Sequence, residues 1–311
     1  MHPSIGAAVE VFVALFALLY GAGFVKNVAY SAALHSGLPA SSAWVAHASG
    51  LGHCAGLVAT FLLLYSRRLR PGPPQRTLLQ CMASVLHSLW RAVLGPGGGS
   101  ARQLLSAPGA LLLAFHLGSL LYLCWGVLAS PQPLDAAAWG SLWGCASPTA
   151  LLWAPAFEEL LFRGALFYLA LQRSGGNVPL AAALGAGAFA AMHAPNILAA
   201  GADWGYVGLQ VLAAAVCGGA WTCVYAAQGC LAEVALLHTA NNLAAVLWLA
   251  GTRSEQPCSL APPPPEQRTA ALLSLLAQTA VYTGGGFMAW KALQRATAAE
   301  GGGWPSGACT R

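Results

Sequence analysis

The sequence predicts an all-α protein, a polytopic bundle of about eight transmembrane helices. Hydrophobic residues make up 57% of its 311 residues and charged residues only 7%, whereas a soluble domain usually carries about 25% charge. The mean hydropathy of +0.62 agrees with this composition. Apolar segments of about 20 residues, the length that crosses a bilayer as a helix, recur along the chain. Together these observations predict an integral, multi-pass membrane protein.

The apolar segments divide the chain in order. We expect spans near 6–24, 43–65, 109–129, 148–171, 178–198, 205–227, 230–250 and 269–291. Between the second and third spans, residues 77–94 show helical apolar spacing typical of an amphipathic segment at the membrane surface. A proline-rich stretch at 261–265 predicts a linker before the last span, and the tail from Ala296 onward is expected to be disordered.

Three regions follow from this pattern. Residues 1–144 hold the N-terminal spans and the amphipathic segment, 145–250 hold the next four spans, and 251–311 hold the linker, the last span and the tail. The net charge of +5 comes without a long basic run, so nothing indicates a nucleic-acid partner. The nine cysteines form no disulfide framework and read as free, buried residues. The sequence does not identify the membrane: a bacterial inner membrane, the endoplasmic reticulum and a plastid all remain open.

The fourth span carries two adjacent carboxylates, Glu158 and Glu159, although the chain has only nine acidic residues. Ionisable groups at membrane depth are costly and tend to mark function. Glu159 and Arg163 lie four residues apart on one helical face, so we expect them to form an ion pair. Glu158 points about 100° away and lacks that partner, which leaves it free to act as a general base or acid. A purely structural ion cluster of all three groups is the alternative.

Two later spans each offer a histidine with a co-facial partner four residues away. Phe189 precedes His193 in the fifth span, where the phenyl ring can pack over the imidazole. His238 precedes Asn242 in the seventh span, and both side chains can donate hydrogen bonds, as an oxyanion-binding pair would. A satisfied core histidine and an interhelical hydrogen bond are the alternatives for these two segments.

Read together, the three segments have the order E-E-x-x-x-R, F-x-x-x-H and H-x-x-x-N, on residues 158–163, 189–193 and 238–242. This order resembles the CPBP family of CAAX proteases and bacteriocin-processing enzymes, which includes the type II CAAX prenyl endopeptidases. The resemblance covers about 145–250 and implies that this region is the catalytic core. It implies an intramembrane endopeptidase of glutamate type, without a covalent nucleophile, that cleaves peptides or prenylated proteins.

The resemblance also assigns roles. Glu158 with His193 would activate a water molecule, and His238 with Asn242 would stabilise the oxyanion. Glu159 and Arg163, with Phe189, would support the site. It implies no cofactor. Zinc held by the two histidines and a carboxylate is kept as an alternative, but Asn242 suits an oxyanion better than a metal. No HExxH, GxSG or GxGD motif indicates another class of protease.

Two other classes of function use the same sequence features. A non-proteolytic scaffold or immunity-type protein would bind another membrane protein through small-residue stretches such as 181–191. A proton-coupled transporter would use the buried glutamates and histidines, but the sequence shows no inverted repeat. The expected partners are therefore the lipid bilayer, a peptide or prenylated protein substrate and, for the scaffold, a membrane protein.

Overall fold

The computed structural model of the protein describes residues 3–39, 43–69, 105–128, 149–198, 204–252 and 265–299. Within these ranges the chain is helical apart from short turns, and no strand occurs. The expected all-α class is therefore confirmed. The amphipathic segment at 77–94, most of the proline-rich linker and the tail from residue 300 onward lie outside the described residues.

The long helices follow the predicted spans closely. They are α1 (Pro3–His35), α2 (Ala43–Leu69), α4 (Ala107–Leu128), α8 (Val178–Ala191), α9 (Trp204–Gln228), α10 (Leu231–Thr252) and α11 (Pro265–Ala299). The fourth predicted span is one helical run of changing pitch, made of η2 (Thr149–Trp153), α6 (Ala154–Glu159), η3 (Leu160–Leu166) and α7 (Phe167–Arg173). A short 3-10 helix, η4 (Ala194–Leu198), follows α8.

Five of these helices are long and apolar enough to cross a membrane. Their apolar stretches are Ala8–His35, Ala43–Leu63, Ala107–Trp125, Val178–Asn196 and Val207–Gln228. A shorter apolar stretch, Leu231–Leu247, lies in α10. Large apolar side chains on the outside, including Phe16, Tyr20 and Trp125, give the lipid-facing surface that such a bundle needs. The protein is a helical membrane bundle.

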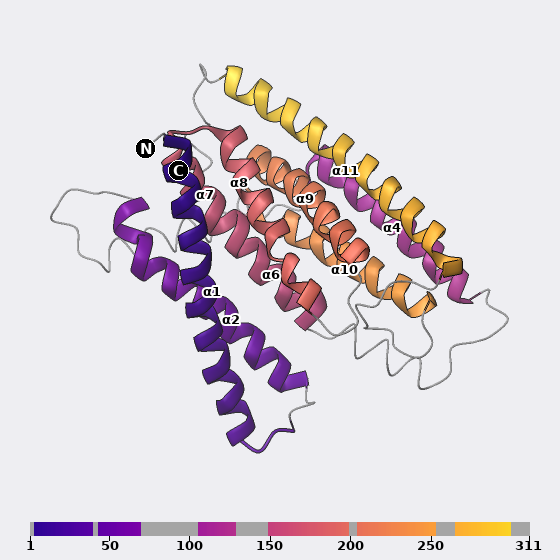
Figure 1. The fold of residues 1–311 in the computed structure, drawn as a ribbon, viewed down its shortest axis with the longest axis horizontal. Helices are drawn as coiled ribbons and strands as arrows, with labels where there is room; N and C mark the ends of the chain where they lie inside the picture. Colours follow the sequence, from indigo (N-terminus) through magenta and orange to yellow (C-terminus); the bar gives the residue numbers. More distant parts are fainter. Residues whose placement is uncertain are drawn as a thin grey trace.

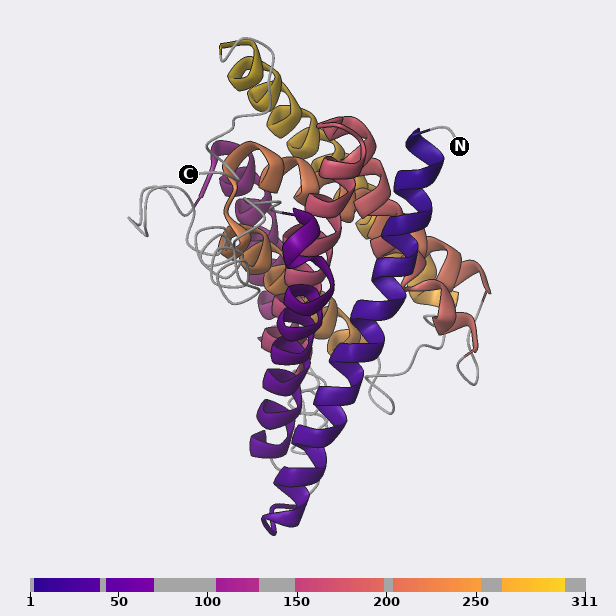
Figure 2. The same cartoon turned by 90° about the vertical axis from the view of Figure 1, so that its left-hand side faces the viewer.

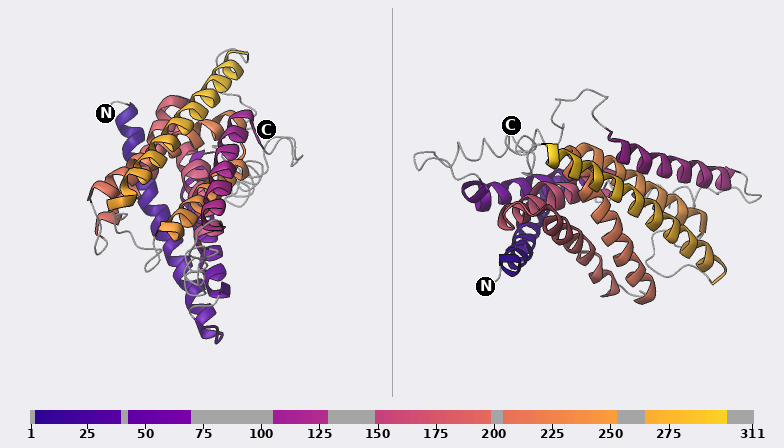
Figure 3. Two further views of the ribbon diagram at one scale, coloured as in Figure 1. Left: turned by 90° about the vertical axis from the view of Figure 1, so that its right-hand side faces the viewer. Right: turned by 90° about the horizontal axis from the view of Figure 1, so that it is seen from above.

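The helices form two groups on either side of the run from Thr149 to Arg173 (Figure 1). On one side, α1 and α2 pack along each other as a hairpin, which Figure 2 shows extending beyond the rest of the bundle. On the other side, α8 packs on α9, α9 on α11, and α4 on both α10 and α11. Figure 3 shows α11 lying along α4 and α9. The central run contacts both groups, so its two glutamates lie inside the bundle.

Helix ends differ from the predicted ones where proline intervenes. The fifth span was predicted to reach residue 198, but α8 ends at Ala191 and the chain continues through a turn into η4. Pro195 has no backbone N–H and restricts the residue before it, which explains the break. The last helix is longer than expected: α11 begins at Pro265 itself, a position that proline tolerates, and continues through Ala296 to Ala299.

Candidate active site

The helix that carries the two glutamates is irregular on both sides of them. The segments η2 and η3 have the wider π-helical pitch, and the backbone N–H of Phe167 donates to the carbonyl of Phe162, five residues earlier. Such π segments inside α-helices are frequent at functional sites. Between these two segments, the six residues of α6, which end at Glu159, keep the α-helical pitch.

Pro155 explains how this helix is attached to its neighbour α10. Because proline has no N–H, the carbonyls of Leu151 and Ala150, four and five residues earlier, lack the donor that residue 155 would supply. Two side chains of α10 reach them instead. Thr239 Oγ1 donates to the Leu151 carbonyl at 3.0 Å, and Asn242 Nδ2 donates to the Ala150 carbonyl at 3.1 Å. These bonds fix the glutamate-bearing helix against α10.

The predicted ion pair between Glu159 and Arg163 is present and fully enclosed. Arg163 Nη1 lies 3.1 Å from both carboxylate oxygens of Glu159, and the side chains of Arg163 and Glu159 are 0% and 1% exposed, respectively. The other terminal nitrogen, Nη2, donates to the Gly218 carbonyl at 2.9 Å. The guanidinium also lies over the rings of Phe189 and Trp221, at 5.0 and 5.6 Å from their centroids. Arg163 therefore links the helix of the glutamates to α8 and α9.

Gly218 permits this approach. A side chain there would place its Cβ 3.0 Å from the ring of Phe189 and 3.5 Å from Arg163 Nη2. Its carbonyl also accepts a hydrogen bond from Thr222 Oγ1 at 2.7 Å. The backbone of α9 thus supplies the arginine with a polar partner in an otherwise apolar core.

His238 lies between the two carboxylates. Its Nδ1 is 2.8 Å from Glu159 Oε1, and its Nε2 is 3.7 Å from Glu158 Oε2. A carboxylate only accepts hydrogen bonds, so Nδ1 carries the proton and donates it to Glu159. One imidazole face stacks on Trp221, with ring centroids 4.6 Å apart and an interplanar angle of 27°. The imidazole is therefore fixed in both position and orientation.

The two neighbouring glutamates have different surroundings. The side chain of Glu159 is 1% exposed, whereas that of Glu158 is 21% exposed. The sequence indicated a carboxylate without a partner at Glu158, but the structure places it within ion-pair distance of His238. Glu158 also interacts electrostatically with His193. It is thus the carboxylate of the pair that a substrate or water can reach.

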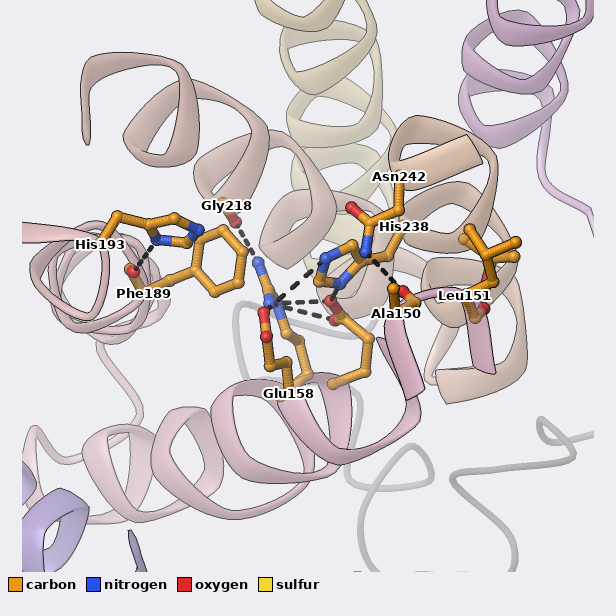
Figure 4. A network of polar contacts seen from close by, with 11 residues as sticks. Ala150, Leu151, Glu158, Phe189, His193, Gly218, His238 and Asn242 are labelled. Atoms are coloured by element: carbon orange, nitrogen blue, oxygen red, sulfur yellow. Dashed lines mark hydrogen bonds and ion pairs between the residues drawn. The ribbon is translucent and has the colours of Figure 1, made fainter. Parts of the chain in front are cut away.

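His193 follows α8, one residue beyond its C-cap. Its Nδ1 is 3.0 Å from the carbonyl of Phe189, which accepts only, so Nδ1 carries the proton and Nε2 has the free lone pair. The ring of Phe189 lies 5.1 Å from that of His193 and 5.7 Å from that of His238. Phe189 therefore packs against both histidines, as the predicted packing on His193 required. In Figure 4, His193 and Phe189 lie on one side of Glu158, with His238 and Asn242 on the other.

Six residues singled out from the sequence form one connected set of contacts, namely Glu158, Glu159, Arg163, Phe189, His193 and His238, and Asn242 lies one turn beyond His238 on α10 (Figure 4). Three further residues were missed. Trp221 stacks on His238, Thr239 donates to the Leu151 carbonyl, and Pro155 lacks the N–H that could donate to the same carbonyl. Proline inside a predicted span was the one available signal, because it must leave carbonyls for another donor.

The polar side chains of the site make hydrogen bonds to one another and to backbone carbonyls. Within the described ranges no three His, Cys, Asp or Glu residues lie close enough together to hold a metal ion. Asn242, which completes the third motif, donates its amide to a backbone carbonyl. His238 likewise has its Nδ1–H donated to Glu159, and His193 has its Nδ1–H donated to the Phe189 carbonyl.

Comparison with known proteins gives one match. Residues 139–244 match the family described as type II CAAX prenyl endopeptidase Rce1-like. Searches among curated proteins and among solved structures found no match. The matched segment contains all three motifs and the helices that bring them together. Residues 139–244, which hold the candidate site, are therefore similar to the Rce1-like type II CAAX prenyl endopeptidases.

Proposed function

We propose that the protein is an active endopeptidase that hydrolyses a peptide bond with a water molecule activated by Glu158 and His193. The observation that carries this proposal is His238, fixed by Glu159 at 2.8 Å with its second nitrogen 3.7 Å from the accessible carboxylate of Glu158. A cluster that served stability alone would have no need to leave one carboxylate 21% exposed.

In the first step, Glu158 accepts a proton from water as the water oxygen attacks the carbonyl carbon of the substrate. His193 supports this transfer, since its Nδ1–H is bound to the Phe189 carbonyl and Nε2 is free to accept a hydrogen bond from the same water. The carbonyl double bond opens, and the negative charge moves to the carbonyl oxygen. The result is a tetrahedral intermediate without a covalent bond to the protein.

His238 and Asn242 stabilise the oxyanion. With Nδ1–H donated to Glu159, a protonated His238 presents Nε2–H on the side of Glu158, where the intermediate forms. The Asn242 amide has two hydrogens, and the Ala150 carbonyl takes only one of them. Its second hydrogen is available to the substrate. Glu158 then gives its proton to the leaving amine, the C–N bond breaks, and the carboxylate is restored.

The substrate class follows from the family and the location of the site. The carboxylates lie inside a helical membrane bundle, so a substrate must bring its scissile bond to membrane depth. A prenylated C-terminal peptide meets this requirement, because its lipid partitions into the bilayer and carries the adjoining peptide with it. We therefore propose prenylated proteins as substrates.

Turnover of a prenylated peptide by the purified protein in lipid tests the proposal. Glu158→Gln is the decisive variant, because it removes the base while keeping the side chain's shape. Its activity should fall to background while its thermal midpoint stays close to that of the wild type. The Arg173→Gln variant, which alters the distant α1–α7 ion pair with Glu10, is a matched control that should retain turnover. Equal turnover by wild type and Glu158→Gln would refute the proposal.

A further inference from the structure

Two helices outside the matched segment 139–244 reach the candidate active site. They are α11, which contains Gln278 and Tyr282, and α4, which contains His116. Both pack on the helices that carry the third motif and Trp221: α4 on α10, and α11 on α9. The side chains at these contacts are polar, with His116 and Tyr282 buried and Gln278 part-buried, which is unusual for packing between apolar spans.

Tyr282 connects to the site through Trp221. The tyrosine is fully buried, and its ring meets the edge of Trp221 at a centroid distance of 5.8 Å and an interplanar angle of 74°. Trp221 in turn stacks on His238 at 4.6 Å. Trp221 is thus held between the imidazole of the site and a tyrosine of α11. A change in the position of Tyr282 would allow the Trp221 ring to tilt, and His238 would then lose the ring that stacks on one of its faces.

His116 of α4 fixes Tyr282 itself. Its Nε2 is hydrogen-bonded to the tyrosine hydroxyl, and the imidazole is 1% exposed. The hydroxyl would otherwise be a buried polar group without a partner, at a substantial energetic penalty. The bond therefore fixes the rotamer of Tyr282 and, as a result, the position of its ring relative to Trp221.

Gln278 makes a second connection, one helical turn earlier on α11. Its amide Nε2 donates to Asn241 Oδ1 at 2.5 Å and lies 3.5 Å from Cys217 Sγ. Asn241 is next to Asn242 and three residues beyond His238 on α10. Gln278 thus holds the same turn of α10 that presents the two third-motif side chains.

Glycines of α11 make these contacts possible by allowing close helix packing. A Cβ at Gly286 would lie 3.1 Å from the Cα of Ala220, the residue before Trp221. A Cβ at Gly285 would lie 2.7 Å from Leu112 of α4. Because either side chain would push α11 away, the small residues keep Tyr282 and Gln278 within reach of α9, α10 and α4.

We propose that Tyr282 and Gln278, with His116 behind Tyr282, are positioning residues of the active site, which hold His238 and the motif turn of α10 in place. The matched segment is then incomplete as a catalytic unit without α4 and α11. The catalytic consequence rests on the proposed function, but the placement of His238 does not. That difference allows the two proposals to be tested separately.

The first measurement is made without substrate. In full-length protein labelled with ¹⁵N-histidine, the His238 Nδ1–H bound to Glu159 should give a downfield proton resonance, assigned by its loss in His238→Gln. Tyr282→Leu, which removes the ring, and Gln278→Met, which removes the donor at similar length, should shift or broaden this resonance. Tyr282→Phe keeps the ring against Trp221 and should lie nearer the wild type. Leu276→Ala, at an exposed position of α11, should leave the resonance unchanged.

The second measurement separates turnover from binding. Tyr282→Leu and Gln278→Met should lower kcat about 10-fold or more while KM changes less than about 3-fold, because small displacements of catalytic groups act on the transition state. An unchanged His238 resonance in folded Tyr282→Leu and Gln278→Met protein would overturn the positioning proposal. If Tyr282→Leu does not fold, an unchanged resonance in Gln278→Met is enough to overturn it. A wild-type protein without turnover would contradict the proposed function and leave the resonance test intact.

Discussion

The hydrogen bond from Thr239 to the Leu151 carbonyl allows a quantitative test of how the glutamate-bearing helix is held. Thr239→Val removes the donor and preserves the branched shape of the side chain. A net hydrogen bond contributes about 0.5–1.5 kcal/mol, and interhelical bonds in membrane proteins average about 0.6 kcal/mol. The bond is 3.0 Å long and part-buried. We therefore expect Thr239→Val to lower the free energy of unfolding by about 1 kcal/mol.

The loss of unfolding free energy in Thr239→Val should depend on the presence of Pro155. In the Pro155→Ala variant, residue 155 regains a backbone N–H that can donate to the Leu151 carbonyl within the helix. The hydroxyl of Thr239 then becomes redundant, so Thr239→Val should have little effect on stability in the Pro155→Ala background. The double-mutant cycle should give a coupling energy of about 1 kcal/mol, above the roughly 0.3–0.5 kcal/mol within which independent sites add.

Reversible unfolding of the four proteins in lipid–detergent mixtures, followed by circular dichroism, measures the cycle. The alternative is that Thr239 acts only through packing against its neighbours. In that case Thr239→Val would have the same effect with and without Pro155. An equal loss of stability in both backgrounds would therefore refute the idea that Pro155 creates the need for the Thr239 hydrogen bond.

Three further predictions concern the charged groups and the chemistry. Arg163→Ala should lower the free energy of unfolding by about 3–5 kcal/mol, because it leaves a buried carboxylate with one partner fewer. Folded yield and thermal midpoint measure the loss of stability, and a stable but inactive variant would contradict the structural role of Arg163. His238→Ala and Asn242→Ala should each reduce turnover about 10²–10³-fold, as expected for the loss of one oxyanion donor. If a variant keeps turnover within about 3-fold of the wild type, the substituted residue does not stabilise the oxyanion. Strong zinc chelation should leave turnover largely intact, whereas complete loss that zinc restores would establish a metalloprotease.

The sequence predicted the elements because membrane helices have a strong one-dimensional signal. Long apolar runs placed α2, α4 and α9 within a few residues of their observed ends, whereas α1 continues well past the predicted end at residue 24, to His35. The pairing of Glu159 with Arg163 could also be predicted, since both lie on one helix with a fixed spacing. Contacts within a helix depend only on spacing, and spacing can be read directly from the chain.

Contacts between helices could not be read in this way. A tryptophan in an apolar span looks the same whether it faces lipid, as Trp125 does, or stacks on a catalytic-site histidine, as Trp221 does. Likewise, nothing in the spacing of Glu159 indicated that it would be shared between Arg163 and His238. Such contacts depend on the rotation of each helix about its axis, which apolar composition all around a helix leaves undetermined.

The charges of the site explain why two adjacent glutamates are used. Glu158 and Glu159 carry two negative charges, and Arg163 with a protonated His238 would balance them. Arg163 cannot neutralise both glutamates by itself. Two aromatic rings and the Gly218 carbonyl enclose its guanidinium, so it cannot move to form an ion pair with Glu158. Glu159 binds both groups, because its Oε1 accepts hydrogen bonds from Arg163 Nη1 and His238 Nδ1, while His238 Nε2 lies 3.7 Å from Glu158 Oε2. A single glutamate could neutralise the arginine or act as a base, but the same carboxylate could not do both, because protonation during turnover would strand the buried arginine.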